Sequence, residues 1–357
     1  MEDYFSGAYC TIAADTADGP DSGFLRERPV TGDKARKCHL FQSNPGSPES
    51  ALYICNNIDD FARDVERSYL NTRGWVFQER ALSRRTIHFT DTQAYWECGR
   101  GVRCETLNRI FNRKSSFLSD PKFPYSAIQF YEGMRIKFFQ CLYSRYSTLD
   151  FSHEVDRSVA MFGIERRLAK TYGVPGYGIL GGNYLYQSLL WQAMDANKPL
   201  RKINYKDGNK PPSWSWMAVT GPIKYMDAPK DTMVWDYTIK SPLKDQSVRA
   251  DIANLPLKDP LISDFMVQAR DIKLSKEIDT QCFIYDRPEY KDNKLVEEKL
   301  KCVIIGCEKK ESGDLPSNWY TLLIIPTGTT GDYERIGVAH MTAKAIDLAN
   351  GIDVRIV

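Results

Sequence analysis

The chain has 357 residues, 42% of them hydrophobic and 26% charged, so it is long enough to bury a substantial core. Its 48 Lys and Arg residues nearly balance 46 Asp and Glu residues, and the net charge of +2 is spread along the sequence. This balance argues against a nucleic-acid-binding protein and against attachment to an anionic membrane surface.

The cysteines and the first residues bear on the cell compartment. Nine cysteines at irregular spacing include no C-x-x-C pair, a pattern that favours reduced thiols over disulfides or a zinc site. The opening Met1-Glu2-Asp3-Tyr4 carries no basic or apolar leader, and no run of about 18 apolar residues follows. We therefore expect a cytoplasmic protein with no membrane span.

Residues 1 to about 100 alternate short apolar runs with loops rich in Gly, Pro and Ser. Strands are predicted at Tyr9–Ala14, Leu52–Cys55, Thr86–Phe89 and Ala94–Cys98. Asn71 is expected to cap a helix that runs to about Ser83. This first part of the chain is therefore predicted to be a mixed α/β region.

Residues 125 to about 196 are predicted to be helical because apolar residues recur there on single faces. Two stripes have helical spacing: Tyr131, Met134, Phe138 and Leu142, then Met161, Ile164, Leu168 and Tyr172. Ser152 is expected to cap the second helix and Gly173 to end it. We interpret both stripes as core.

From Pro211 onward the pattern changes to short β-like runs between loops rich in Pro, Asp, Lys and Gly. The predicted strands are Ser213–Val219, Met233–Ile239, Phe265–Ile272, Cys282–Tyr285, Lys301–Cys307, Trp319–Ile325, Arg335–His340 and Val354–Val357. An antiparallel sheet or partial barrel is the expected arrangement, which makes the chain α+β.

The predicted helix after Asn71 carries the main candidate chemistry. Trp75, Gln78 and Glu79 share one face, so the Glu79 carboxylate has an indole beside it, which would raise its pKa. Arg73, in the first turn, needs an anionic partner. One hypothesis makes Glu79, Gln78 and Arg73 catalytic; the other joins them with Arg85 in a buried network that pins the helix to the sheet.

Other motifs give weaker indications. The run from Asp59 to Asp64 looks like a metal–diphosphate motif but has no downstream companion, so we interpret it as a solvated helix start. The four histidines are isolated, and no phosphate loop or nucleophile elbow occurs, so no metal or cofactor is expected. Several large side chains could line a substrate pocket or could be plain core. The candidate substrate-binding residues are Trp75, Arg85, Trp96, Trp214 and Trp216.

The segment from Arg73 to Phe89, with Tyr95-Trp96-Glu97-Cys98 after it, resembles the last signature block of the fungal heterokaryon-incompatibility (HET) domain. Further similar segments are Met1 to Ala14, Gly23-Phe24-Leu25 with Arg28-Pro29, Tyr143-Ser144-Arg145, Asp156-Arg157, Leu190-Trp191, Pro212 to Trp216 and Tyr333 to Val338. Two strings that open full-length members, A-L-S-Y-x-W-G and W-I-D-x-x-C-I-x-Q, do not occur here. The resemblance thus implies a shortened member that lacks the N-terminal signature blocks.

The resemblance also implies a division of the chain. Residues 1–120 would be a mixed α/β remnant of a HET domain, which is itself similar to Toll/interleukin-receptor (TIR) domains. Residues 121–200 would be helical and residues 201–357 β-rich, all in one compact unit. In TIR-like relatives a helix glutamate can cleave NAD, and Glu79 is the matching position here. The strands that mostly build the cofactor pocket in such folds are those that this chain lacks.

Shortened HET-like proteins also serve in fungal secondary-metabolite pathways, where norbornene-forming intramolecular Diels–Alder cyclisations of terpenoids are attributed to them. The resemblance therefore favours a cofactor-independent cyclase that acts on a small apolar substrate. One alternative is an incompatibility or immune factor that cleaves NAD or self-associates. Another is a non-enzymatic interaction module.

Overall fold

The computed structural model divides the chain into two compact units, Met1–Phe130 with Leu149–Phe151 (unit 1) and Tyr131–Thr148 with Ser152–Val357 (unit 2). It describes residues 2–17, 19, 21–25, 27, 38–42, 51–55, 59–106, 108–110, 123–124, 135–195, 198–205, 210–228, 232–244, 262–273, 282–291, 293–309 and 318–357. Among these residues, no helix combines the length and the apolar character that crossing a bilayer demands.

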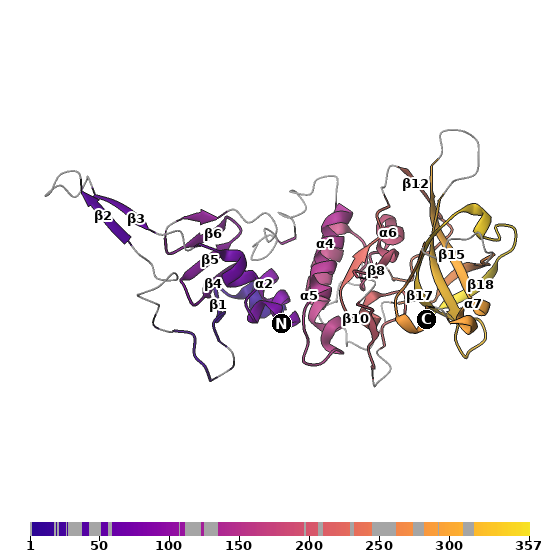
Figure 1. Ribbon diagram of the computed structural model, residues 1–357, viewed down its shortest axis with the longest axis horizontal. Helices are drawn as coiled ribbons and strands as arrows, with labels where there is room; N and C mark the ends of the chain where they lie inside the picture. Colours follow the sequence, from indigo (N-terminus) through magenta and orange to yellow (C-terminus); the bar gives the residue numbers. More distant parts are fainter. Residues whose placement is uncertain are drawn as a thin grey trace. The chain divides into compact units, whose positions relative to one another are not determined.

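Unit 1 is built on a five-stranded sheet with the order β1-β4-β5-β6-β7 (Figure 1). Its strands are β1 (Thr11–Ala13), β4 (Arg85–Phe89), β5 (Ala94–Cys98), β6 (Gly101–Cys104) and β7 (Arg109–Ile110). β1 runs parallel to β4, and the other pairs are antiparallel. A separate hairpin joins β2 (Cys38–Gln42) to β3 (Ala51–Cys55). The helical elements are α1 (Glu2–Gly7), the π-helical turn Ala62–Glu66, the 3-10 turn Leu70–Thr72 and α2 (Gly74–Leu82).

One face of this sheet is buried and carries polar residues. Thr86 and His88 are the buried residues of β4, and Tyr95 and Glu97 are those of β5. Because side chains alternate along a strand, all four lie on the same face of the sheet. α2 covers this face, since its Arg80 side chain reaches Glu97. The opposite face carries the remaining side chains of both strands.

The start of α2 differs from the prediction. Asn71 does not cap the helix, which begins at Gly74 after Arg73, a residue with extended backbone and no side-chain cap. The Gly74 N–H instead donates to the Asp150 carbonyl at 2.9 Å. A Cβ on Gly74 would lie 1.8 Å from the Phe151 ring, so this position has room only for glycine.

The first helices described in unit 2 are α4 (Arg135–Ser147), α5 (Asp156–Tyr172) and the short α6 (Leu185–Leu189). Both apolar stripes are confirmed as core where the structure describes them, and Tyr131 and Met134 lie outside the described residues. Gly173 ends α5 in a left-handed conformation with φ +69, as expected. The expected Ser152 cap is wrong, because α5 starts after Val155 and has no side-chain cap.

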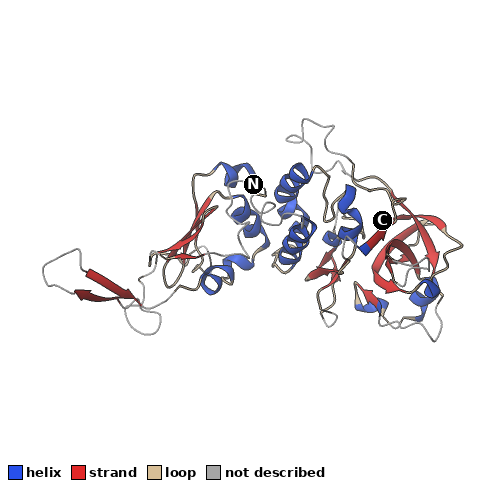
Figure 2. Ribbon diagram, turned by 90° about the horizontal axis from the view of Figure 1, so that it is seen from above, coloured by secondary structure: helices blue, strands red, loops and turns tan. Residues whose placement is uncertain are grey.

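The C-terminal part of unit 2 is a seven-stranded sheet. Its strands are β12 (Met233–Trp235), β13 (Phe265–Asp271), β14 (Phe283–Tyr285), β15 (Lys301–Glu308), β16 (Trp319–Pro326), β17 (Asp332–Met341) and β18 (Ile352–Ile356). The pairings β13–β15, β15–β16, β16–β17, β17–β18 and β18–β13 form a closed circuit, visible in Figure 2. Only β17–β18 is parallel. The prediction was an antiparallel sheet or a partial barrel, and the structure has a mainly antiparallel sheet in which five strands close into a barrel.

Irregular pairing helps this barrel to curve. The register shifts between Ile304 and Gly306 in β15 and between Leu323 and Ile324 in β16. A cluster of buried apolar residues that includes Cys302, Leu323 and Ile336 packs against this sheet, together with Val296 of the helix that precedes β15. Helix α7 (Lys294–Lys299) precedes β15.

Two small ladders link the helices of unit 2 to its barrel. They pair β8 (Trp191–Ala193) with β11 (Ile223–Tyr225), and β9 (Arg201–Lys202) with β10 (Val219–Thr220). The expected strand Ser213–Val219 is wrong over most of its length, because residues Trp216–Ala218 form a 3-10 turn. Ser215 caps this turn by accepting a hydrogen bond from the Met217 N–H. Helices and a mainly antiparallel sheet together confirm the α+β class.

Candidate functional site

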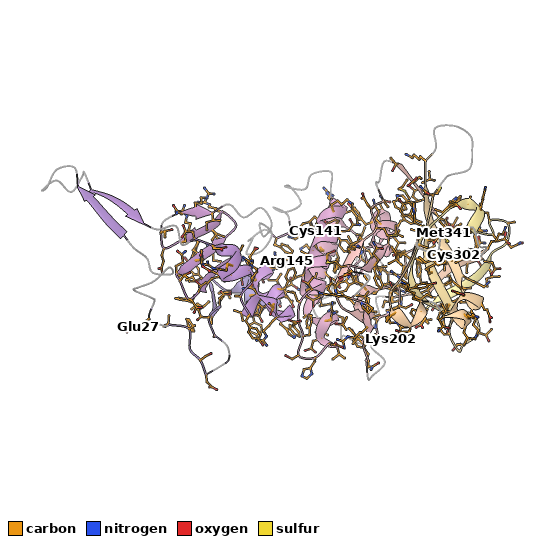
Figure 3. The ribbon with its side chains drawn as sticks, in the orientation of Figure 1. Glu27, Cys141, Arg145, Lys202, Cys302 and Met341 are labelled. Atoms are coloured by element: carbon orange, nitrogen blue, oxygen red, sulfur yellow. The ribbon has the colours of Figure 1, made fainter. Side chains whose placement is uncertain are left out.

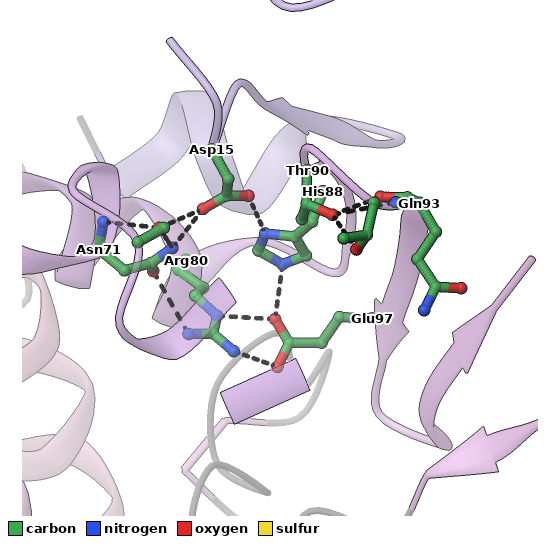
Figure 4. Close-up of polar contacts among 9 residues, drawn as sticks. Asp15, Asn71, Arg80, His88, Thr90, Gln93 and Glu97 are labelled. Atoms are coloured by element: carbon green, nitrogen blue, oxygen red, sulfur yellow. Dashed lines mark hydrogen bonds and ion pairs between the residues drawn. The ribbon is translucent and has the colours of Figure 1, made fainter. Parts of the chain in front are cut away.

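Four charged side chains of unit 1 form a continuous buried network, the charge network (Asp15, Arg80, His88 and Glu97; Figure 4). Arg80 donates to both Glu97 oxygens, through Nε and Nη2, at 2.7 Å each. His88 Nε2 lies 3.1 Å from Glu97 Oε2, and its Nδ1 lies 2.8 Å from Asp15 Oδ2. The network therefore connects the loop after β1 to α2, β4 and β5.

The network extends one step further at Asp15. Its Oδ1 atom accepts hydrogen bonds from Ser68 Oγ at 2.6 Å and from Asn71 Nδ2 at 2.7 Å. The side-chain Oδ1 atom of Asn71 in turn accepts from Arg80 Nη1 at 3.3 Å. Asn71, expected to cap α2, therefore bridges two members of the charge network.

The protonation states follow from this geometry. Burial raises the pKa of Glu97, but the Arg80 guanidinium and the His88 ring outweigh it and hold that pKa at about 2. Burial lowers the pKa of His88, yet its hydrogen bonds to Asp15 and Glu97 leave it raised overall. Arg80 and His88 thus lie against the side chains of Asp15 and Glu97, and a buried network with such paired members is suited to holding elements together. Phe61 packs edge-on against His88, with ring centroids 5.8 Å apart.

This arrangement has the form of the pinning network expected for the helix, with different members. Arg73, Gln78, Glu79 and Arg85 are not part of it, and that version of the hypothesis is wrong. The sequence did contain a signal for two members of the charge network. His88 and Glu97 occupy those alternating positions of their strands whose side chains face the core. The partner Arg80 follows Glu79 directly and points to the other side of the helix.

The acidic run before α2 is also used structurally. Asp59 accepts hydrogen bonds from Gln93 at 2.8 Å and Asn108 at 2.6 Å, and Asp64 accepts from Tyr95 at 2.8 Å. The interpretation as a solvated helix start is therefore wrong for these two carboxylates. Among the described residues, no three or more His, Cys, Asp or Glu side chains are grouped so that they could hold a metal ion.

Three predicted site residues lie at the start and on one side of α2: Arg73, which directly precedes the helix, and Trp75 and Glu79 within it; we call them together the outer face of α2. Arg73 is exposed, while Trp75 and Glu79, four positions apart, are half-buried. Burial raises the pKa of Glu79, and the charge of Arg73 offsets only part of this effect. This helix face therefore presents a carboxyl group that keeps its proton to higher pH than usual, beside an indole.

Gln78 lies next to this face but is buried. Its Oε1 atom has no hydrogen-bond partner among the described residues, although its side chain is shielded from solvent. A buried amide oxygen without a donor is destabilising. Gln78 thus lies on the buried side of α2, one residue before Glu79.

The remaining predicted residues lie elsewhere. Arg85 stacks on Tyr9, with Cζ 4.8 Å from the ring centroid, and donates to the Tyr9 carbonyl at 3.2 Å. Trp96 is half-buried on the sheet face opposite to Glu97 and α2. Trp214 and Trp216 belong to the core of unit 2, with 1% and 0% of their surface exposed. The eight predicted residues therefore do not form one site.

Unit 2 holds two buried charge clusters that sequence reasoning missed. Glu165 of α5 accepts hydrogen bonds from the Tyr143 hydroxyl and, at 2.6 Å, from the Gly178 N–H, and burial raises its pKa to about 7. Arg335 lies over the Trp191 ring, with Cζ 3.3 Å from its centroid, and pairs with Asp286 at 3.3 Å. Burial raises the pKa of Asp286 to about 6.

Trp216 is a further meeting point of buried residues in unit 2. Arg157 lies 5.7 Å from the Trp216 ring centroid, and the Tyr143 ring lies 5.2 Å from it. Segments far apart in the sequence therefore meet through their aromatic and cationic residues in unit 2. Packing accounts for these residues without a ligand.

Trp75→Ala is expected to lower the free energy of unfolding by about 1–2 kcal/mol, because a half-buried indole has less apolar surface to lose than a core tryptophan. Urea unfolding of the full chain, followed by circular dichroism, measures this change. A loss above about 3 kcal/mol would mean that Trp75 is core and would remove it from the outer face of α2.

No family model, curated protein or solved structure matches this chain.

Proposed function

We propose that this protein is a cofactor-independent cyclase that carries out an intramolecular Diels–Alder reaction on a small apolar molecule, in the cytoplasm of a fungal cell that makes terpenoid secondary metabolites. The proposal rests on the resemblance to shortened HET-domain proteins and on one structural observation. That observation is the outer face of α2, where a carboxyl group with a raised pKa lies beside an indole.

A cycloaddition needs little from a protein beyond placement and polarisation. Three π bonds of the substrate become two σ bonds and one π bond, so no atom, electron or proton is gained or lost. Holding the diene against the dienophile removes much of the entropic barrier, and a hydrogen bond to a conjugated carbonyl stabilises the charge that develops there. Both tasks fit the residue types on the outer face of α2.

In this proposal each residue has one role. Protonated Glu79 donates a hydrogen bond to the carbonyl conjugated with the dienophile, and burial favours this protonated form. Trp75 packs against the apolar chain of the substrate. Arg73 adds positive potential near the same oxygen, and Gln78 holds its carboxamide next to Glu79. The charge network holds α2 on the sheet beneath them.

The test uses a synthetic terpenoid in which a cyclopentadiene and an enal are joined by a flexible chain. Purified full-length protein is expected to accelerate its cyclisation over buffer alone and to favour one stereoisomer, as measured by chiral chromatography. Glu79→Gln should slow the catalysed reaction about tenfold, which corresponds to about 1.4 kcal/mol of lost transition-state stabilisation. Glu298→Gln, which alters an exposed glutamate of α7, serves as the matched control and should not change the rate.

The same preparation distinguishes the alternative activity. Incubation with NAD should release no nicotinamide above the background of a boiled sample. Catalytic release of nicotinamide that is lost in Glu79→Gln would contradict the cyclase proposal and favour an NAD-cleaving incompatibility factor. Equal cyclisation rates with and without protein would also contradict it.

A further inference from the structure

Two cysteines of unit 1 occupy directly opposite positions in a β-ladder. Cys38 begins β2, Cys55 ends β3, and the antiparallel register of the hairpin makes them partners (Figure 1). Their pairing closes the ladder at the end away from the connection between the two strands. Neither cysteine is a member of the charge network or of the outer face of α2.

The register meets the backbone requirement of a disulfide. Residues that are paired across an antiparallel ladder have Cα atoms about 4.5 to 5.5 Å apart. A disulfide joins residues whose Cα atoms are about 4.4 to 6.8 Å apart. Both kinds of antiparallel pair fall within this range, so Cys38 and Cys55 can be bridged without a shift of either strand.

No other ladder in the described part of the chain sets two cysteines opposite each other. Cys98, Cys104, Cys302 and Cys307 lie in strands, and their partners are other residue types. The sequence has nine cysteines in all. The described registers therefore single out one pair.

The hairpin depends on its own pairing. Among the described strands, β2 and β3 pair only with each other. An isolated two-stranded hairpin is at best marginally stable in water. A covalent bond across its open end removes many conformations of the separated strands and thereby favours the paired ones. Strand pairing and disulfide formation are therefore coupled.

We propose that Cys38 and Cys55 form a reversible redox site, in which a small disulfide such as oxidised glutathione converts the two thiols into a disulfide that holds the hairpin closed. Disulfides of cytoplasmic proteins are usually transient and redox-sensing, so the reduced thiols are the resting state of the site. The site is independent of the cyclase chemistry proposed for α2.

The exchange balances in atoms and electrons. One cysteine thiolate attacks a sulfur of oxidised glutathione, which breaks the glutathione S–S bond and releases one glutathione thiolate. The second cysteine thiolate attacks the protein sulfur of this mixed disulfide, forms the bond between Cys38 and Cys55 and releases the second glutathione thiolate. The two protons lost by the cysteines go to the two glutathione thiolates, and the two electrons lost by the protein reduce glutathione.

The test incubates reduced full-length protein with oxidised glutathione, blocks the remaining thiols with N-ethylmaleimide in denaturant, and analyses an unreduced tryptic digest by mass spectrometry. Trypsin is expected to release residues 38–63 as one peptide, which contains Cys38 and Cys55 and no other cysteine. This peptide should carry no maleimide and should be lighter than the reduced peptide by two hydrogen atoms. Dithiothreitol should restore both thiols.

The folded register is expected to favour the bond beyond what nearness in the sequence provides. At equal ratios of reduced to oxidised glutathione, the equilibrium constant for disulfide formation should be at least about tenfold larger in native protein than in urea. Formation of the bond should also slow amide hydrogen exchange in β2 and β3 by at least about tenfold.

Two variants serve as controls. Cys55→Ser should leave Cys38 as a mixed disulfide with glutathione and should show no slowing of hydrogen exchange. Cys141→Ser, which removes the exposed cysteine of α4 that is labelled in Figure 3, should form the bond between Cys38 and Cys55 as the parent does.

Several results would overturn the proposal. Neither cysteine might be oxidised in the parent, each might keep its own glutathione, or either might pair with a different cysteine. An equilibrium constant that is the same in native protein and in urea would show that the register does not favour the bond. Unchanged hydrogen exchange after the bond has formed would show that the disulfide does not hold the hairpin closed.

Discussion

Replacing Arg80 by Met is expected to lower the free energy of unfolding of unit 1 by about 3–5 kcal/mol, because it removes from the buried Glu97 carboxylate the guanidinium that donates to both of its oxygens. The loss comes from desolvation. Glu97 is fully buried, and Arg80 is the partner that holds the pKa of this carboxyl near 2. Without the guanidinium, either the buried charge stays less fully compensated or Glu97 takes up a proton and loses its ion pair with His88.

Urea unfolding of full-length protein near neutral pH measures this effect. Arg84→Met is the matched control, because Arg84 is exposed four positions further along the chain and should change stability by less than about 0.5 kcal/mol. A loss below about 1 kcal/mol for Arg80→Met would show that the charge network does not hold α2 on the sheet.

Replacing Glu165 by Gln is expected to remove a pH dependence from unit 2. Burial raises the pKa of Glu165 from an ordinary value of 4.5 to about 7, so the folded protein binds this proton more tightly than the unfolded chain does. The stability contributed by the protonated group is complete below the unfolded pKa and is lost as the pH rises through the folded pKa. Between about pH 5 and about pH 8 this loss amounts to about 2–3 kcal/mol.

Gln keeps the shape of the neutral acid and can still accept from the Gly178 N–H and the Tyr143 hydroxyl. The free energy of unfolding of the variant, relative to that of the parent, should therefore rise by about 2–3 kcal/mol between about pH 5 and about pH 8. Urea unfolding at both pH values measures this difference. The pKa of Asp286 is raised to about 6, so Asp286 also makes the free energy of unfolding fall as the pH rises. This contribution is the same in both proteins and cancels in the difference. If the difference in free energy of unfolding between the two proteins were the same at both pH values, Glu165 would have to be ionised across the whole range.

Much of the fold could be predicted from the sequence because it depends on local periodicity. Ala94–Cys98 and Phe265–Ile272 alternate buried and exposed residues, and the structure contains the corresponding strands β5 and β13. The stripe from Met161 to Tyr172 has helical spacing and forms the buried face of α5. The helix starts were harder to predict, because at Gly74 the N–H is satisfied by Asp150, a residue distant in sequence. No local pattern reports such a partner.

The candidate site was predicted only in part, for the same reason. The spacing of Trp75 and Glu79 placed them on one helix face, and the structure shows both half-buried there. The partners of the buried charges could not be read locally: Arg80 and Glu97 are 17 residues apart, and Asp15 and His88 are 73 apart. Nor does the spacing of Trp214 and Trp216 distinguish a pocket wall from the fully buried core that they form in unit 2.

The most direct test of the proposed role of Glu79 is the pH dependence of cyclisation of the tethered cyclopentadiene–enal by the parent protein and by Glu79→Gln. The donor form of Glu79 is protonated and predominates below its raised pKa, so the parent's catalysed rate should fall as the pH rises through that pKa. The Gln variant should be slower at low pH and should show no fall over the same interval. A parent rate that stays flat, or a Gln variant that falls in the same way, would contradict the account.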